Sequence, residues 1–301
     1  MACYVQLSDR GILCERVEAA RRVLDACTLC PRACGVNRNE SPGTWCRTGA
    51  RPLVAAWHAH FGEEAPLVGR NGSGTIFFGS CSLGCVFCQN WTISRSLEGR
   101  EISAGELALV MVSLQRAGCH NINLVTPSHM VPQILEAVAL AVPRGLNVPL
   151  VYNTGGYDSV ETLRLLDGVV DIYMPDIKFL DADAARRYCT AGDYPAVVRA
   201  AVAEMHRQVG DLVMDEEGIA TRGLLVRHLV MPGRAADTRK VCRFLAREVS
   251  CDTYLNLMDQ YRPCGMAGDC PEIARRITRE EFNQALEAAA EEGLTRAGRS
   301  A

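Results

Sequence analysis

Strand-like and helical segments alternate along the chain from residue 75 onward, and this alternation constrains the fold more than any other feature. The strand-like runs lie at residues 75–78, 121–126, 148–153, 169–173, 223–230 and 253–257. The helical patterns lie at residues 104–117, 131–142, 159–166, 182–189, 194–209 and 236–249. Strands joined through a helix run parallel, because the crossover returns the chain to the same end of the sheet. The pattern therefore predicts an α/β protein with a parallel sheet, which could be doubly wound or closed toward a barrel.

Three further elements complete this outline. A helix is expected at residues 15–26, a hairpin at 212–220 and a C-terminal helix at 278–292. Thr278 at the start of the last helix is followed three residues later by a glutamate, which is the pattern of a capping box. Asp158 and Asp181 are the expected N-caps of the helices that follow them.

Three cysteines directly follow the first strand of the series, in the stretch GTIFFGSCSLGCVFCQNW. Cys81, Cys85 and Cys88 have the spacing C-x3-C-x2-C, and Phe87 precedes the last of them. A loop this short can turn three thiolates toward one point, as zinc and iron–sulfur sites require. A structural zinc site has four protein ligands, and no fourth Cys or His follows closely. Three ligands favour a four-iron cluster with one iron left for a ligand that is not protein, and three metal-free, reduced cysteines are the alternative.

Four more cysteines lie within twenty residues near the N-terminus, in the stretch CTLCPRACGVNRNESPGTWC. Cys27, Cys30, Cys34 and Cys46 form a complete ligand set for a structural zinc or a second iron–sulfur cluster. We favour iron–sulfur, because such a cluster could pass electrons. Reduced cysteines without a metal are the alternative.

The composition is that of an ordinary globular chain, with 48% hydrophobic residues, 22% charged residues and a net charge of −3 over 301 residues. It contains no basic stripe for nucleic acid and no apolar run long enough to span a bilayer. Fifteen cysteines without the pattern of a signal peptide favour metal or redox use over disulfides. We therefore expect a cytoplasmic protein that binds neither nucleic acid nor membrane. For Cys264 and Cys270, in RPCGMAGDC, a flexible loop is favoured over a further ligand pair.

Polar side chains gather where the strand-like runs end, and the carboxyl ends of parallel strands meet at one side of a sheet. They are Thr126, Ser128 and His129 in NINLVTPSH, Asn153 and Thr154 in YNTGGY, Asp176 and Lys178 in YMPDIKF, and Arg227 and His228 in LLVRHLVMPG. Simpler interpretations stay open for several of them. His129 could be a surface or capping residue, His228 a core histidine bonded to a backbone carbonyl, and the Asp-x-Lys pair a surface ion pair.

The cysteine loop after the first strand resembles the C-x3-C-x-aromatic-C signature of the radical S-adenosylmethionine (radical SAM) enzymes. YMPDIKF and LLVRHLVMPG resemble strand segments of glycyl-radical activating enzymes. Further stretches are similar to the PflX-like group, relatives of pyruvate formate-lyase activating enzyme: ACTLCPRACGVNR, AWHAHFGEEAPLVGRNGSGTIFFGSC, NINLVTPSH and YLNLMDQYRP. The likeness covers nearly all of residues 27–263.

This resemblance implies a partial (β/α)6 barrel at residues 71–263. A helix and a cysteine-rich extension at residues 1–70 would precede the barrel, and a tail helix at 264–301 would follow it. It also implies a [4Fe-4S] cluster on the three loop cysteines, whose open iron chelates the amino and carboxylate groups of SAM. One electron from the cluster then cleaves the sulfonium to methionine and a 5′-deoxyadenosyl radical, which abstracts hydrogen from a substrate.

The SAM-binding residues implied by the resemblance are Phe87, Thr126, Ser128, His129, Asn153, Asp176, Lys178, Arg227 and His228. At residues 126–129 the chain matches the family only in the position after the second strand, because the Gly-Gly-Glu-type turn that the family has there is absent. An acidic group such as Asp176 can accept hydrogen bonds from ribose hydroxyls, and the ammonium of Lys178 can pair with the methionine carboxylate. His58, His60, Glu63 and Glu64 either reach the SAM pocket or tie the N-terminal segment to the barrel. No residue is assigned a catalytic role.

The resemblance leaves the substrate open. A glycyl radical enzyme is the first expected substrate, and a small molecule is nearly as well supported. An electron donor such as a flavodoxin or ferredoxin is the implied partner. The rival hypothesis is an iron–sulfur electron-transfer protein without catalytic activity, for which polar residues at six strand ends would be superfluous.

Overall fold

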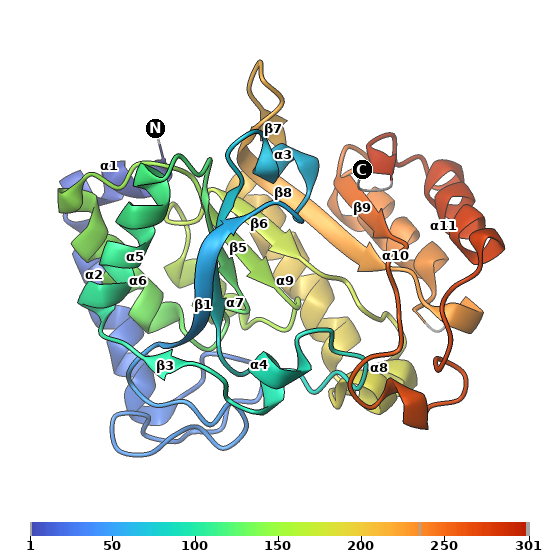
Figure 1. Ribbon diagram of the computed structural model, residues 1–301, viewed down its shortest axis with the longest axis horizontal. Helices are drawn as coiled ribbons and strands as arrows, with labels where there is room; N and C mark the ends of the chain where they lie inside the picture. Colours follow the sequence, from blue (N-terminus) through green and yellow to red (C-terminus); the bar gives the residue numbers. More distant parts are fainter. Residues whose placement is uncertain (1, 235, 299–301) are drawn as a thin grey trace.

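The computed structural model describes residues 2–234 and 236–298, and in these residues ten strands form one mixed, mostly parallel sheet (Figure 1). The strands are β1 (Leu53–His60), β2 (Ser73–Phe78), β3 (Arg100–Glu101), β4 (Ile122–Val125), β5 (Leu150–Thr154), β6 (Ile172–Pro175), β7 (Val213–Met214), β8 (Ala220–Leu229), β9 (Tyr254–Met258) and β10 (Ala297–Gly298). Their order is β10-β9-β8-β6-β5-β4-β2-β1-β3, and β7 pairs with β8. The predicted α/β class with a parallel sheet is confirmed.

The helices lie mostly between the strands of this sheet. The α-helices are α1 (Cys3–Asp9), α2 (Ile12–Arg22), α3 (Ala65–Val68), α4 (Trp91–Arg95), α5 (Ala104–Arg116), α6 (Val131–Ala141), α7 (Val160–Leu165), α8 (Ala182–Cys189), α9 (Tyr194–Val209), α10 (Thr238–Phe244) and α11 (Arg279–Glu291). Short 3-10 segments lie at Val23–Ala26, Val142–Arg144, Pro232–Arg234 and Ala267–Asp269, and a π-helical turn at Leu245–Val249 continues α10.

Six parallel strands form the centre of the sheet. Each neighbouring pair in the series β2, β4, β5, β6, β8 and β9 is parallel. All six correspond to strand-like runs predicted from the sequence, and their ends differ from the prediction by at most three residues. The predicted hairpin also forms, from β7 and the start of β8. Because the six strands are parallel, the residues that follow them lie at a common side of the sheet.

The sequence prediction misses β1 and misassigns one helix cap. β1 runs antiparallel to β2 and carries β3 on its other edge. Its sequence LVAAWHAH lacks the alternation of a half-buried strand, because Val54 alone among its residues is fully buried. Ser159, not Asp158, caps α7, since the Asp158 carboxylate turns inward and accepts from the hydroxyls of Tyr152 and Thr154. The caps predicted at Asp181 and at the start of α11 are confirmed.

The N-terminal helices pack against the sheet domain. Figure 1 shows α1 and α2 beside α5 and α6 at one end of the molecule, and α10 and α11 at the other. Two long-range hydrogen bonds tie α1 to the sheet: the Tyr4 hydroxyl donates to the Val148 carbonyl, and the Cys3 amide donates to the Asp171 carboxylate, both at 2.8 Å. Within the described residues, no helix combines the length and apolar character needed to cross a membrane.

Candidate active site

A cavity of about 240 Å³ lies at the carboxyl ends of the six parallel strands. Ten of the residues predicted from the sequence line it: Cys81, Cys85, Phe87, Cys88, Thr126, Asn153, Thr154, Asp176, Lys178 and Arg227. Leu229, Met231 and Met258 add an apolar side to its wall. The parallel sheet thus brings together side chains that are up to 146 residues apart in the sequence.

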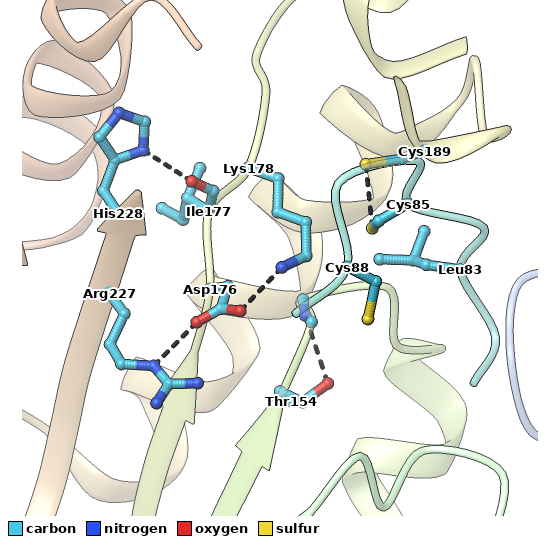
Figure 2. A network of polar contacts seen from close by, with 12 residues as sticks. Leu83, Cys85, Cys88, Thr154, Asp176, Ile177, Lys178, Cys189, Arg227 and His228 are labelled. Atoms are coloured by element: carbon cyan, nitrogen blue, oxygen red, sulfur yellow. Dashed lines mark hydrogen bonds and ion pairs between the residues drawn. The ribbon is translucent and has the colours of Figure 1, made fainter. Parts of the chain in front are cut away.

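The cysteine loop that follows β2 supplies three thiols to the cavity wall. Its backbone is held by the end of α8: the Gly84 N–H donates to the Cys189 carbonyl at 3.0 Å, and the Val86 N–H donates to the Tyr188 carbonyl at 2.9 Å. These two hydrogen bonds flank Cys85. Figure 2 shows the thiols of Cys85 and Cys88 on the side of Lys178, with Asp176 and then Arg227 of β8 beyond it.

Those charged side chains form a continuous network along the cavity wall (Figure 2). Asp176 accepts from Lys178 Nζ through one oxygen and from Arg227 Nε through the other, both at 2.8 Å. The same guanidinium donates to Asn153 Oδ1 at 2.7 Å. Burial alone would raise the pKa of Asp176, but Arg227 and Lys178 outweigh burial and lower it. The wall therefore carries two fixed cations that share one ionised carboxylate.

Thr126 is held in an unusual backbone conformation at the end of β4. Its φ of 59° lies in the left-handed region, which a β-branched residue rarely adopts. Such a conformation costs roughly 1–3 kcal/mol and persists where the surroundings enforce it. The Thr126 N–H donates to the Asn153 carbonyl at 2.8 Å, which fixes the turn at the cavity wall. Strain at a strand end that faces a cavity is typical of a binding turn.

Comparison with known proteins agrees with this geometry. Residues 75–216 match the family model of the Radical SAM superfamily, a range that runs from β2 past the charged end of β6. The chain belongs to the radical SAM superfamily. The uncharacterized protein MJ0674 of Methanocaldococcus jannaschii is 33% identical over 282 residues, which cover 91% of this chain and 77% of the relative. The uncharacterized protein MJ0808 of the same organism is 25% identical over 188 residues, covering 55% and 52%.

Radical SAM proteins use a [4Fe-4S] cluster and SAM, and the donor set at the cavity fits both. In the described residues, no three His, Cys, Asp or Glu side chains already surround a single metal position. A four-iron cluster does not need such convergence, because each cysteine binds a different iron. Cys81, Cys85 and Cys88 present three separate sulfurs to one cavity, and Lys178 and Arg227 offer cationic donors beside them for the carboxylate of SAM.

Three other predicted SAM contacts lie outside the cavity wall. His129 is fully buried behind the cysteine loop, where its Nε2 bonds the Gly79 carbonyl at 2.9 Å and burial lowers its pKa to about 4. His228 bonds the Ile177 carbonyl through Nδ1 at 2.7 Å and Thr238 through Nε2. His228 is therefore a core histidine bonded to a backbone carbonyl, which is one of the interpretations that the sequence allowed.

The hydroxyl of Ser128 is also withdrawn from the cavity, because it pairs with Thr154 Oγ1 at 3.2 Å. Side chains alternate along a strand, so Arg227 and His228 cannot both face the cavity. Phe87 does line the wall, and its ring packs edge-on against Phe179 with centroids 5.9 Å apart.

Glu63 and Glu64 approach the charged network from the segment between β1 and α3. Glu63 Oε2 lies 3.3 Å from Arg227 Nη1, and Glu64 Oε1 accepts from Asn256 Nδ2 at 2.8 Å. Burial and the neighbouring carboxylates raise the pKa of Glu63 to about 7, although Arg227 opposes this. His58 and His60 do not join the network and pack instead around the ring of Phe77.

The N-terminal cysteines lie in a separate segment that packs against the cysteine loop and α6. Cys27 and Cys46 are buried, and Cys30 and Cys34 are half-buried. Burial raises the pKa of Cys30 to about 12, and the other three thiols add to this rise, so Cys30 lies within electrostatic reach of each of them. In the described residues, the four sulfurs do not already surround a single metal position. Thr48 Oγ1 donates to Cys46 Sγ at 3.2 Å.

Arg38 lies at the centre of this N-terminal segment, and the sequence did not single it out. It is 1% exposed and donates to the carbonyls of Thr48, Gly49 and His129 and to the Thr48 hydroxyl. Its Nη1 also lies 4.0 Å from Cys27 Sγ. Within the described residues, no carboxylate forms an ion pair with it, so this buried cation is balanced only by neutral oxygens and by sulfur.

Proposed function

We propose that this radical SAM protein is an enzyme that binds a [4Fe-4S] cluster through Cys81, Cys85 and Cys88 and cleaves SAM reductively at the cavity. The proposal rests on one observation: three thiols and a charged network line the same cavity at the carboxyl ends of the parallel strands. When bound, the cluster and SAM would supply a 5′-deoxyadenosyl radical for hydrogen abstraction.

The residues of the wall would bind and orient SAM. Both oxygens of Asp176 are already engaged, so this carboxylate acts by holding Lys178 and Arg227 in place. Lys178 is then the cation best placed to pair with the methionine carboxylate. The Thr126 turn and Asn153 would offer polar groups to the ligand, and the apolar side of the cavity would exclude water from it.

The order of the sheet supports the partial (β/α)6 barrel that we propose for the core. The central strands run in the sequence β2, β4, β5, β6, β8, β9, with helices connecting them. In the described residues this path ends at β10 on one side and β3 on the other, so the sheet stays open. An opening of this kind would give a substrate a lateral route to the cavity.

The proposed substrate follows from a sequence resemblance at the cavity. The Asp-x-Lys element at the cavity resembles that of glycyl-radical activating enzymes, which makes a glycyl radical enzyme the first substrate to test and a small molecule the second. A low-potential donor such as a flavodoxin or ferredoxin would supply the electron. The PflX-like group is the subgroup that the motifs favour.

We also propose a second metal site at Cys27, Cys30, Cys34 and Cys46. A metal held by four thiolates carries negative charge, and Arg38 supplies a buried cation within reach of Cys27 Sγ. A buried charge without a partner is costly, so the guanidinium favours deprotonated sulfur beside it. With four protein ligands, this site would not bind SAM. We favour iron–sulfur over zinc, because iron could pass electrons to the cluster in the cavity.

The experiment that tests the proposed activity is anaerobic reconstitution with iron and sulfide, reduction with dithionite and addition of SAM. Formation of 5′-deoxyadenosine and methionine is the expected result. An electron carrier without catalytic activity would take up iron and be reduced, yet leave SAM intact. That outcome would favour the rival function and reject ours.

A further inference from the structure

We propose that Cys189 is a positioning residue that donates a hydrogen bond to the Cys85 sulfur and thereby makes the cluster easier to reduce. The inference rests on the proposed binding of a cluster by Cys81, Cys85 and Cys88. It assigns a role to a fourth thiol, which lies outside both cysteine motifs of the sequence.

The geometry begins with the end of α8. Cys189 is the last residue of this helix and is completely buried, and its Sγ lies 3.3 Å from Cys85 Sγ (Figure 2). That separation is far longer than a disulfide bond and within the range of a hydrogen bond between sulfurs. The two backbone hydrogen bonds from Gly84 and Val86 to the end of α8 hold Cys85 against this thiol.

Cys189 is placed to donate to a ligand, not to act as one. Cys85 lines the cavity, whereas Cys189 does not. When Cys85 is a thiolate bound to iron, it can only accept, so the proton between the two sulfurs belongs to Cys189. Cys81, Cys85 and Cys88 would hold the cluster from the cavity wall, whereas Cys189 lies behind Cys85 at the end of α8.

A hydrogen bond to a cluster sulfur shifts the reduction equilibrium. Reduction adds one electron, and part of the added negative charge resides on the cysteine sulfurs. A donor at Cys85 therefore stabilises the reduced state more than the oxidised state, which raises the reduction potential. A hydrogen bond of this class contributes about a factor of ten to the equilibrium.

The test is an EPR-monitored redox titration of the reconstituted protein, with dithionite as reductant and without SAM. Cys189→Ala should be about tenfold harder to reduce, which equals a 59 mV lower midpoint potential for a one-electron couple. Cys189→Ser keeps a donor and should stay close to the wild-type value. Cys242→Ala, which removes a buried cysteine from α10, is the matched control and should leave the potential unchanged.

Wild-type protein exchanged into deuterated buffer offers a second measurement. Electron–nuclear double resonance of the reduced cluster should detect an exchangeable proton near a cysteine sulfur, and Cys189→Ala should lose it. The wild-type spectrum alone still tests the inference if the alanine variant assembles its cluster poorly, because the inference requires an exchangeable proton near a cysteine sulfur.

Equal potentials in wild type and Cys189→Ala, or equal shifts in the alanine and serine variants, would overturn the inference and leave packing as the role of Cys189. So would the absence of the exchangeable proton in wild type. If wild-type protein bound no cluster at all, the proposed function would fail first. The two failures are therefore distinguishable.

Discussion

The two cysteine sites of this protein each have an arginine beside them, half-buried at Arg227 and buried at Arg38, and the two arginines are balanced in opposite ways. Arg227 lies within 4 Å of three carboxylates, those of Asp176, Glu63 and Glu64. Arg38 forms no ion pair with a carboxylate in the described residues and meets carbonyl oxygens, a hydroxyl and the sulfur of Cys27.

The difference is the one expected if the cavity binds SAM and the N-terminal cysteines bind a metal, as we propose. At the cavity the protein supplies its own counter-charges, and Asp176 pairs with both Arg227 and Lys178. In the N-terminal segment the missing anion would come from thiolates on a metal. Under this proposal the first site would exchange its ligand, while the metal of the second would form part of the fold.

The largest expected effect is the loss of SAM cleavage when the cysteines of the cavity, and not those of the N-terminal segment, are changed. Changing Cys81, Cys85 or Cys88 to alanine should abolish 5′-deoxyadenosine formation while the protein stays folded, because the three side chains are only partly buried and line the cavity. Chromatographic detection of 5′-deoxyadenosine is the measurement, and Cys251→Ala, at an exposed position, is the control. Wild-type product levels in any one of the three variants would contradict the cluster assignment.

The next effect concerns metal content. A triple alanine variant at Cys81, Cys85 and Cys88 should retain iron or zinc after anaerobic purification, and SAM should not change its spectrum. Four thiolates fill the coordination of the N-terminal metal, so SAM has no position to occupy. Metal analysis that finds neither iron nor zinc would show that these cysteines only pack.

Arg38→Met should remove that metal and lower the free energy of unfolding by about 3–5 kcal/mol, the range observed when a buried charged group loses its partner. Denaturant titration together with metal analysis measures both effects. Arg10→Met, at an exposed site on the surface, serves as the control. Unchanged metal content in the Arg38 variant would show that the guanidinium of Arg38 does not balance the charge of a metal site.

Lys178→Ala should weaken SAM binding by about 1–3 kcal/mol, as expected for the loss of a charge-assisted hydrogen bond. Calorimetry on the reconstituted protein measures the affinity. Lys240, exposed on α10, is the other lysine of the chain and provides the matched alanine control. Equal affinities in both variants would show that the carboxylate of SAM lies elsewhere.

The smallest effect is a pH dependence at Glu63. Its pKa of about 7 is above the usual value, so the folded state holds a proton that the unfolded state releases between about pH 4.5 and 7. Its contribution to stability is thus present at low pH and is lost as the pH rises to 7. Glu63→Gln should gain on the order of 1–2 kcal/mol relative to wild type between pH 5 and 8, by denaturant titration. A constant difference across this range would contradict the raised pKa.

The predictions that succeeded rest on local sequence patterns, whereas the contacts that were not predicted join residues far apart in the sequence. The six parallel strands and their helices follow from hydrophobic periodicity, and the cysteine loop follows from spacing alone. Arg38 meets His129 across 91 residues, and Cys189 meets Cys85 across 104, so no local signal could indicate either contact. The polar residues at strand ends were only partly predictable, because alternation directs Arg227 into the cavity and His228 into the core.

The contact between the cysteine loop and the end of α8 also has a consequence for biosynthesis. The ribosome adds about 5–20 residues per second, so the 104 residues between Cys85 and Cys189 require roughly 5–20 s. During that interval the nascent loop exposes three thiols without the helix end that later fixes Gly84 and Val86. The loop reaches its final shape only after α8 has emerged and docked. If the three cysteines bind a cluster, the binding loop would therefore be complete only after residue 189 has been synthesised.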